Sequence, residues 1–211
     1  MRIIAGAARR TQLKTLRSRA LRPTAERVRE AVFGSLGVRV EGGRFLDLYA
    51  GAGTVGLEAL SRGAAQATFV ESHRPAGRVI EENARRCGFE GLVRVIVAPV
   101  ARGLARLRRE GAAFELVYVD PPYDTGEVEG TMAWLGQWVR MVSGEGIVIC
   151  QHSRHEEIGE QIGGLMRMRR RRFGETVVDF YQPGSRSEQE MADSSGLGGQ
   201  RIDDGTLRGD V

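Results

Sequence analysis

One stretch of this chain decides its fold: Asp47-Leu48-Tyr49-Ala50-Gly51-Ala52-Gly53-Thr54-Val55-Gly56. It ends a short apolar run over residues 44–49 that predicts a buried strand, and it leads into a predicted helix over 54–62. Gly51, Gly53 and Gly56 have the spacing G-x-G-x-x-G, typical of the tight strand-to-helix turn in nucleotide-binding folds. Glycine permits close backbone approach to a ligand, and the start of the helix presents free N–H groups. The stretch therefore predicts a nucleotide-like ligand at this turn.

Strands and helices alternate on both sides of this turn. Further strands are predicted over residues 67–71, 93–97, 115–119 and 146–150, and helices over 24–37, 75–88, 100–110, 129–141 and 154–162. Thr24 is expected to cap the first of these helices, and residues 166–173 and 176–181 to form a closing hairpin. Such alternation implies an α/β protein with a right-handed, doubly wound and mostly parallel sheet. Ligands bind beyond the carboxyl ends of the strands in sheets of this kind.

Two carboxylates near the glycine turn distinguish between nucleotide ligands. Glu71 ends the second predicted strand, where it can accept hydrogen bonds from both hydroxyls of a ribose. This would suit either a dinucleotide or S-adenosyl-L-methionine. Asp47 lies four residues before Gly51, where its charge would oppose a pyrophosphate but would pair with the ammonium group of an amino acid. The pair therefore favours S-adenosyl-L-methionine.

A second motif, Asp120-Pro121-Pro122-Tyr123, follows the apolar run over residues 116–119. The run predicts a buried parallel strand, so the motif falls where such a strand presents its ligand-binding loop. Two consecutive prolines fix φ and remove two backbone donors, which leaves a rigid loop with free carbonyls. A carboxylate, free carbonyls and an aromatic ring together suit a flat ring that bears an amine.

Basic residues are concentrated at the N-terminus. Residues 1–30 carry two acidic side chains and nine basic ones, namely Arg2, Arg9, Arg10, Lys14, Arg17, Arg19, Arg22, Arg27 and Arg29. Residues 2–17 also hold short β-like stretches, which predict a hairpin that cannot build a core of its own. Such a basic hairpin suits phosphate contacts on folded RNA, and solvated arginines on a mobile arm would explain the same charge.

Composition divides the chain into a basic extension over residues 1–21, a main domain over 22–182 and an acidic Gly/Ser-rich tail over 183–211. The tail is expected to be disordered. No apolar run approaches the roughly 20 residues of a membrane span, and the N-terminus lacks the apolar stretch of a signal peptide. We therefore expect a cytoplasmic protein that does not bind membranes. The histidines and cysteines lack the spacing of metal ligands, so no metal site is predicted.

Longer stretches of the chain resemble a known family. Phe45-Leu-Asp-Leu-Tyr-Ala-Gly-Ala-Gly-Thr-Val-Gly-Leu-Glu-Ala-Leu-Ser-Arg-Gly63 and Asp120-Pro-Pro-Tyr123 look like the class I methyltransferases that modify exocyclic amines. Arg22-Pro-Thr-Ala-Glu-Arg-Val-Arg-Glu-Ala-Val-Phe33 and Arg2-Ile-Ile-Ala-Gly6 narrow the resemblance to the bacterial 16S ribosomal RNA guanine-N2 methyltransferases. The resemblance runs from about residue 2 to residue 181. It implies a Rossmann-like sheet of seven strands with an antiparallel hairpin at its C-terminal end.

The resemblance also implies roles for individual residues. Asp120 and the Pro121 carbonyl would accept the amine protons of guanine, and Pro122 and Tyr123 would complete the catalytic loop, with the tyrosine ring stacked on the base. The methyl donor S-adenosyl-L-methionine would be bound by Thr24, Asp47, Tyr49, Gly51, Gly53, Gly56, Glu71, Ser72 and Val100. RNA would be bound by Arg2, Arg9, Arg10, Lys14, Arg17 and Arg22. The implied partner is 16S ribosomal RNA within an assembling small ribosomal subunit, and the implied enzyme is a monomer.

One departure from the family pattern concerns the adenine of the methyl donor. After the third strand the family often has a polar residue, whereas this chain has Ala98-Pro99-Val100, so backbone groups and apolar contacts would hold the adenine. Three other functions stay open: methylation of adenine N6 in DNA or RNA, an RNA-assembly factor without turnover, and an NAD-dependent oxidoreductase. The Asp-Pro-Pro-Tyr loop fits the amines of guanine and adenine equally.

Overall fold

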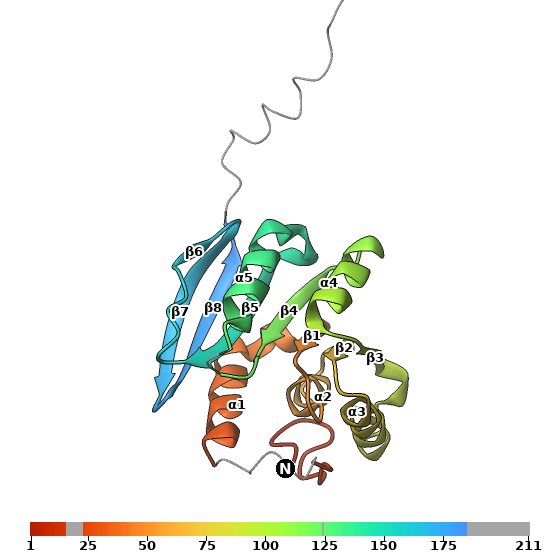
Figure 1. The fold of residues 1–211 in the computed structure, drawn as a ribbon. Helices are drawn as coiled ribbons and strands as arrows, with labels where there is room; N and C mark the ends of the chain where they lie inside the picture. The colour runs from red at the N-terminus through yellow and green to blue at the C-terminus, as the bar shows by residue number, and fades with distance from the viewer. Residues whose placement is uncertain (16–22, 124, 185–211) are drawn as a thin grey trace, which may run out of the picture.

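A mixed sheet organises the computed structural model, which describes residues 1–15, 23–123 and 125–184 (Figure 1). The strands lie in the order β3-β2-β1-β4-β5-β8-β7-β6. Their bounds are β1 (Arg44–Leu48), β2 (Gln66–Glu71), β3 (Val93–Val97), β4 (Phe114–Val119), β5 (Val142–Ser153), β6 (Gln161–Ile162), β7 (Leu165–Phe173) and β8 (Thr176–Pro183). The first five strands are parallel, and β8, β7 and β6 continue the sheet in antiparallel pairing. The order reverses between β1 and β4, which is where a doubly wound sheet binds its ligand.

Helices cover both faces of this sheet (Figure 1). One buried cluster contains Phe33 of α1, Leu57 of α2 and Ile80 of α3, whereas a second cluster contains Leu104 of α4 and Leu135 of α5. Three helices therefore lie on one face, which we call the α1 face, and two on the other. The helices are α1 (Pro23–Leu36), α2 (Thr54–Ser61), α3 (Arg74–Cys87), α4 (Val100–Arg109) and α5 (Glu127–Gln137), with 3-10 turns η1 (Gly37–Val40), η2 (Glu90–Leu92) and η3 (Val139–Met141).

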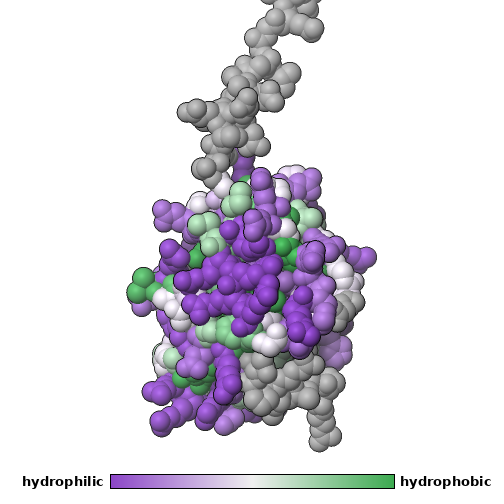
Figure 2. Space-filling model, turned by 90° about the vertical axis from the view of Figure 1, so that its left-hand side faces the viewer, coloured by the Kyte–Doolittle hydropathy of each residue, from purple (hydrophilic) through white to green (hydrophobic). Residues whose placement is uncertain are grey.

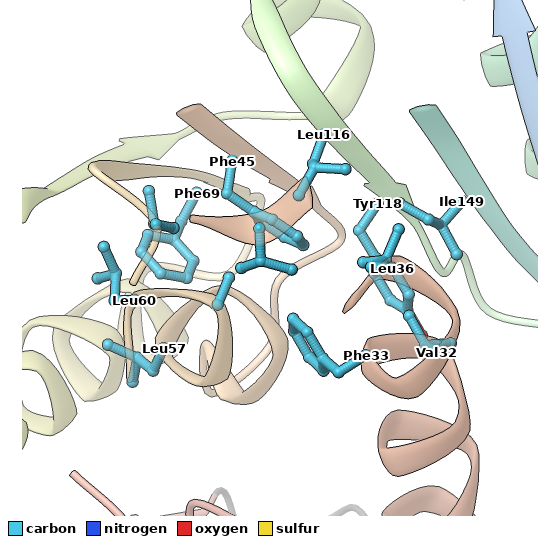
Figure 3. Packing of buried hydrophobic residues seen from close by; sticks show 14 of the residues in the cluster. Val32, Phe33, Leu36, Phe45, Leu57, Leu60, Phe69, Leu116, Tyr118 and Ile149 are labelled. Atoms are coloured by element: carbon cyan, nitrogen blue, oxygen red, sulfur yellow. The ribbon is translucent and has the colours of Figure 1, made fainter. Parts of the chain in front are cut away.

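Figure 3 shows the packing on the α1 face, where Val32 and Leu36 lie beside Tyr118 of β4 and Phe33 points toward β1. The Phe33 ring also stacks on Phe45 of β1, with ring centroids 6.4 Å apart. Strands between two helical layers need apolar side chains on both sides, which explains the near-continuous apolar runs of β1 and β4. These packed strands hold the loops at their carboxyl ends in fixed positions.

The N-terminal segment packs on α2 and does not form an extended hairpin. Its antiparallel pairing is short: an isolated bridge joins Arg2 and Gln12, and the Ile3 N–H donates to the Thr11 carbonyl at 3.1 Å. The predicted hairpin is therefore present, but only over a few residues. The N–H groups of Ile4 and Ala5 instead donate to the Glu58 carboxylate of α2, at 2.8 and 3.1 Å. These bonds satisfy donors that a longer hairpin would have paired. The side chains that this segment buries in the core of the α1 face are Ile3, Ala8 and Leu13.

The C-terminal third departs from prediction in two places. Residues 154–162 do not form the predicted helix, because they form a turn and the short strand β6, and the sheet has eight strands where seven were predicted. The physical reason is Gly163-Gly164, a pair suited to a tight hairpin turn, across which Ile162 pairs with Leu165. Strand β5 also extends well beyond the predicted residues 146–150. The class of fold is confirmed as Rossmann-like α/β.

Some predicted features fall at the margins of the described residues. Helix α1 begins at Pro23, so Thr24 lies within its first turn and does not cap it. The Thr24 side chain lies outside the described part of the structure, as do Arg17, Arg22 and residues 185–211. Among the residues that the structure does describe, no helix has both the length and the apolar character of a membrane span.

Candidate active site

The carboxyl ends of the parallel strands border a cavity of about 460 Å³. It lies at the reversal of strand order between β1 and β4, where sequence reasoning expected a ligand. Eight residues predicted from the sequence line it, namely Asp47, Tyr49, Gly51, Glu71, Ser72, Val100, Asp120 and Pro122. The fold thus brings the glycine turn and the Asp-Pro-Pro-Tyr loop to one cavity.

The glycine turn forms one wall of this cavity. Gly53 has a φ of +76°, a backbone conformation that side chains disfavour, and it immediately precedes α2. Gly56 leaves no room for a side chain, because a Cβ there would lie 2.7 Å from Phe69 Cζ. The Gly56 N–H donates to Asp47 Oδ2 at 2.9 Å. Gly53 and Gly56 therefore hold the turn and Asp47 in position, whereas Gly51 lines the cavity itself.

Tyr49 carries backbone strain just after β1. Its φ of +63° is unusual for a residue with a side chain, and such strain is concentrated at functional sites. The Tyr49 hydroxyl lies 2.7 Å from Thr131 Oγ1 of α5. Burial raises the pKa of this phenol to about 12, so it stays neutral at physiological pH. The hydrogen bond and the strained backbone together fix the Tyr49 ring beside the cavity.

Glu71 is held by backbone groups at the end of β2. Its Oε2 accepts the Gly51 N–H and its Oε1 accepts the His73 N–H, both at 2.7 Å. A carboxylate has about four lone-pair sites, so these two bonds orient Glu71 and leave acceptor capacity for a ligand. Because Glu71 lines the cavity, this capacity faces a bound molecule.

Three carboxylates give the cavity a strong preference for positive charge. Burial raises the pKa of the Asp47 carboxyl well above its usual range; the Gly56 N–H opposes the shift, and the charges of Asp120 and Glu71 add to it. A cation bound among the three carboxylates would relieve their repulsion, whereas a pyrophosphate would increase it. The residues present therefore fit a ligand with ammonium and sulfonium groups better than a dinucleotide.

Gln151 of β5 organises the Asp-Pro-Pro-Tyr loop. Its Nε2 donates to Asp120 Oδ1 at 3.0 Å and to the Tyr123 hydroxyl at 3.2 Å. Its Oε1 accepts the hydroxyl of the buried Tyr118 at 2.7 Å, which fixes the orientation of the amide. Sequence reasoning missed Gln151, although a polar residue directly after the apolar run 147–150 is a signal for the end of a buried strand. The amide thus sets the position of both loop side chains.

Arg29 of α1 is a second residue that sequence reasoning did not place in the cavity. It lines the cavity with a side chain only 4% exposed. Its Nη2 donates to the Arg2 carbonyl at 2.9 Å, and its Nε lies 3.6 Å from Glu58 Oε2. Burial lowers the pKa of Arg29, and the charge of Glu58 opposes this shift. The buried pair links α1 and α2 to the N-terminal segment.

The N-terminal segment also reaches the cavity. Met1 lines it, and its Sδ lies 3.4 Å from Thr54 Oγ1 at the start of α2. Asn83 of α3 bridges the segment to the glycine turn, since its Nδ2 donates to the carbonyls of both Lys14 and Ala52 at 3.0 Å. This segment is therefore part of the cavity wall, a role that its basic composition did not predict.

The predicted RNA-binding side chains of this segment lie outside the cavity. Arg2, Arg9 and Arg10 are exposed and border a separate recess together with Arg27 of α1. Lys14 forms an ion pair with Glu82 of α3. These four basic side chains are thus exposed and are not part of the cavity lining.

Known proteins resemble this chain in both sequence and structure. The family model described as "Conserved hypothetical protein 95" matches residues 1–182. The Bacillus subtilis protein named "Putative rRNA methyltransferase YlbH" is 30% identical over 182 residues, which cover 86% of this chain and 98% of that protein. The chain belongs to this family of ribosomal RNA methyltransferases. Membership of the ribosomal RNA methyltransferases, which was predicted from residues 45–63, 120–123, 22–33 and 2–6, is thereby confirmed.

Two further proteins are similar to the chain. The Escherichia coli ribosomal RNA small subunit methyltransferase D is 37% identical over 132 residues, which cover 63% of this chain and 65% of that protein. A solved Escherichia coli structure titled as the "Putative methyltransferase yhhF" is 29% identical with a TM-score of 0.74, and the match covers 88% of this chain and 99% of that one. The class I methyltransferase fold is therefore shared across nearly the whole of that structure.

Proposed function

We propose that this protein transfers a methyl group from S-adenosyl-L-methionine to the N2 amine of a guanine in 16S ribosomal RNA. Membership of the ribosomal RNA methyltransferase family supports the substrate, and the resemblance of residues 22–33 and 2–6 to guanine-N2 enzymes supports the base. One observation carries the proposal: the Asp120 carboxylate is oriented by Gln151 at the edge of a cavity that prefers a cation. A carboxylate in that position can receive an amine beside a positively charged methyl donor.

The cavity can hold the methyl donor with the residues that line it. Asp47 would pair with the donor's ammonium group, and Glu71 would accept hydrogen bonds from its ribose hydroxyls. Val100 begins α4, and the first N–H groups of a helix have no intrahelical partners, so this turn can meet the adenine with apolar and backbone contacts. When bound, the donor supplies an electrophilic methyl group on a sulfonium sulfur.

The Asp-Pro-Pro-Tyr loop would activate the guanine amine by positioning it. The N2 lone pair of guanine is delocalised into the ring, so the amine must pyramidalise toward the methyl group before it reacts. Asp120 and the Pro121 carbonyl would accept the two N–H groups, and the carboxylate would stabilise the positive charge that develops on nitrogen. The Tyr123 ring, held through its hydroxyl by Gln151 and Thr176, would stack on the base. The base must leave its own stack to reach this loop.

The test of this function is nucleoside mass spectrometry after reaction in vitro. Purified protein is incubated with isotopically labelled S-adenosyl-L-methionine and with small ribosomal subunits or free 16S RNA from a strain that lacks the corresponding enzyme. Labelled N2-methylguanosine is expected, with subunits as the better substrate and with the protein acting as a monomer. Labelled N6-methyladenosine would contradict the choice of base, and RNA binding without transfer would indicate an assembly factor.

Replacing Asp47 with asparagine tests the cofactor part of the proposal. Because burial raises the pKa of Asp47 in the folded protein, its ionisation at neutral pH opposes folding, and this penalty is absent below the usual pKa of aspartate. Asp47→Asn should therefore raise the melting temperature of the donor-free protein. It should also weaken binding of the donor about tenfold or more, since a charge-assisted hydrogen bond is lost. Calorimetric titration with S-adenosylhomocysteine checks the second effect, and unchanged affinity would contradict the role of Asp47.

Replacing Arg9 and Arg10 with alanine tests the RNA-binding part. Both side chains are exposed and border the recess outside the cavity, so RNA affinity should fall while affinity for the donor stays unchanged. The slope of log affinity against log salt should decrease by about 1.4 if each arginine contacts one phosphate of a single strand. Fluorescence anisotropy with 16S RNA across a salt titration measures both quantities. Equal affinity of the variant and the wild type at every salt concentration would refute the assignment.

A further inference from the structure

Strand β7 carries five arginines within the six residues 167–172. Two of them pair with acidic residues: Arg167 with Glu160 and Arg170 with Asp179, both at 2.7 Å. Within the described part of the chain, the other three have no acidic partner, and all three are exposed. They are Arg169, Arg171 and Arg172. Three guanidinium groups on one strand thus face solvent without charge compensation from the described residues.

Strand pairing places two of these three on the α1 face. Arg169 lies opposite Phe180 and Arg171 opposite Val178 on β8, and directly opposed residues of an antiparallel pair share a face. Phe180 and Val178 belong to the buried cluster of the α1 face. Arg169 and Arg171 therefore project from the same side of the sheet as α1 and the N-terminal segment. Arg172 lies one residue out of this alternation and projects from the opposite face.

Arg169, Arg171 and Phe173 form a row on this face of β7, and the row leads toward the Asp-Pro-Pro-Tyr loop. Phe173 follows two residues after Arg171 and lies opposite Thr176, whose Oγ1 is 3.0 Å from the Tyr123 hydroxyl. At about 3.3 Å per strand residue, Arg171 lies about 7 Å and Arg169 about 13 Å along β7 from Phe173. The row thus connects the loop that would stack on the target base to two exposed guanidinium groups. Figure 2, which looks onto this end of the sheet, shows a band of hydrophilic side chains across the face.

We propose that Arg169 and Arg171 bind phosphates of the ribosomal RNA that flanks the target nucleotide. The inference rests on the proposed function and adds a second contact surface, separate from the N-terminal arginines. RNA carries a phosphate at every nucleotide, so a strand that leaves the pocket along β7 would meet the two guanidinium groups in succession. Arginine suits this role because its planar guanidinium can donate two parallel hydrogen bonds to a phosphate.

A simpler reading is that the arginines only protect a sheet edge. Beyond the two-residue pairing with β6, the remaining length of β7 is an edge strand, and charged side chains keep such edges from pairing with other molecules. Glutamate would preserve this protection, because it is also charged, but it would repel phosphate. The double variant R169E/R171E therefore separates the two readings.

The experiment measures binding of 16S RNA and of small ribosomal subunits by fluorescence anisotropy, at salt concentrations from about 0.05 to about 0.5 M. R169Q/R171Q should weaken binding about tenfold at about 0.1 M salt and lower the salt slope by about 1.4. R169E/R171E should weaken it further and remain monomeric. The matched control is R102E/R109E, which makes the same charge change on exposed positions of α4, on the other face of the sheet. This control should change the affinity far less.

The outcomes separate this inference from the proposed function. The inference would be overturned if both β7 variants were folded, as judged by melting temperature, and bound RNA with the affinity and salt slope of the wild type. Methyl transfer by the wild type would still uphold the proposed function. An equal loss of RNA affinity in R102E/R109E would also overturn the inference, because the loss would then come from the change in net charge and not from the position of the arginines on β7. If the β7 variants lost RNA binding but the wild type transferred no methyl group, the RNA-binding role of Arg169 and Arg171 would be upheld and the proposed function refuted.

Discussion

Asp120→Asn is expected to lower the single-turnover rate of methyl transfer by about 10²–10³-fold, the cost of removing one charge-stabilising group from an active site. Asparagine has nearly the same shape, and its side-chain oxygen can still accept the Gln151 amide that now donates to Asp120 Oδ1 at 3.0 Å. The fold and the loop should therefore persist. What is lost is the negative charge beside the nitrogen that becomes cationic.

Rapid-quench measurement with labelled donor and saturating small ribosomal subunits gives this rate directly. Affinity for S-adenosylhomocysteine should not fall, because Asp120 would contact the base and not the amino-acid end of the donor. Glu129→Gln is the matched control, since it removes one carboxylate from an exposed position near the start of α5. A rate within threefold of wild type for Asp120→Asn would exclude the carboxylate from the chemical step (about 0.6 kcal/mol or less at the transition state).

Glu58→Ala is expected to lower the free energy of unfolding by about 3–5 kcal/mol, the usual effect of removing one partner of a buried ion pair. Glu58 is fully buried, and its carboxylate accepts the N–H groups of Ile4 and Ala5 and the Nε of Arg62. The 4% exposed Arg29 would keep its charge in the interior with its closest carboxylate removed. Glu26 also acts on the Arg29 charge, but its effect is smaller than that of Glu58.

Urea denaturation followed by circular dichroism measures this loss. Hydrogen exchange adds a local readout, because the Ile4 and Ala5 amides should lose protection before the rest of the sheet does. Glu82→Ala on α3 is the control: it also removes a carboxylate that pairs with two basic residues, Lys14 and Arg86, but at the exposed surface. It should leave stability nearly unchanged. A similar loss in both variants would show that burial of the charge is not the cause.

Much of the candidate site could be predicted because its signals are local. Asp47, Gly51 and Glu71 lie within or next to short apolar runs whose carboxyl ends must meet at one edge of a parallel sheet. The Asp-Pro-Pro-Tyr loop follows the same rule. Residues at these ends can be assigned to one cavity without knowing any side-chain contact, because the sheet itself brings the ends together.

The residues that support the site could not be predicted in the same way. Gln151 acts on Asp120 and Tyr123 from the neighbouring strand, about 30 residues along the chain. In the sequence, Arg29 looks like one more basic residue in a basic segment. Its burial becomes evident only when α1 packs against the cavity. Residues 154–162 have the composition of a surface helix, yet the Gly163-Gly164 turn pairs their end with β7. In each case a contact distant in sequence overrides or completes the local signal.

Local patterns along the chain were thus enough to predict the α/β class, the ligand edge of the sheet and the residues at the ends of β1, β2 and β4. These follow from apolar periodicity, glycine spacing and the geometry of parallel strands, all of which act over a few residues. Three features could be read only from the folded chain. The N-terminal segment lines the cavity, Gln151 orients the Asp-Pro-Pro-Tyr loop, and Arg169 and Arg171 share a face of β7 with Phe173, opposite the Thr176 that contacts Tyr123. Burial of a charge and pairing across strands depend on which distant segments meet, and that is settled by packing of the whole core.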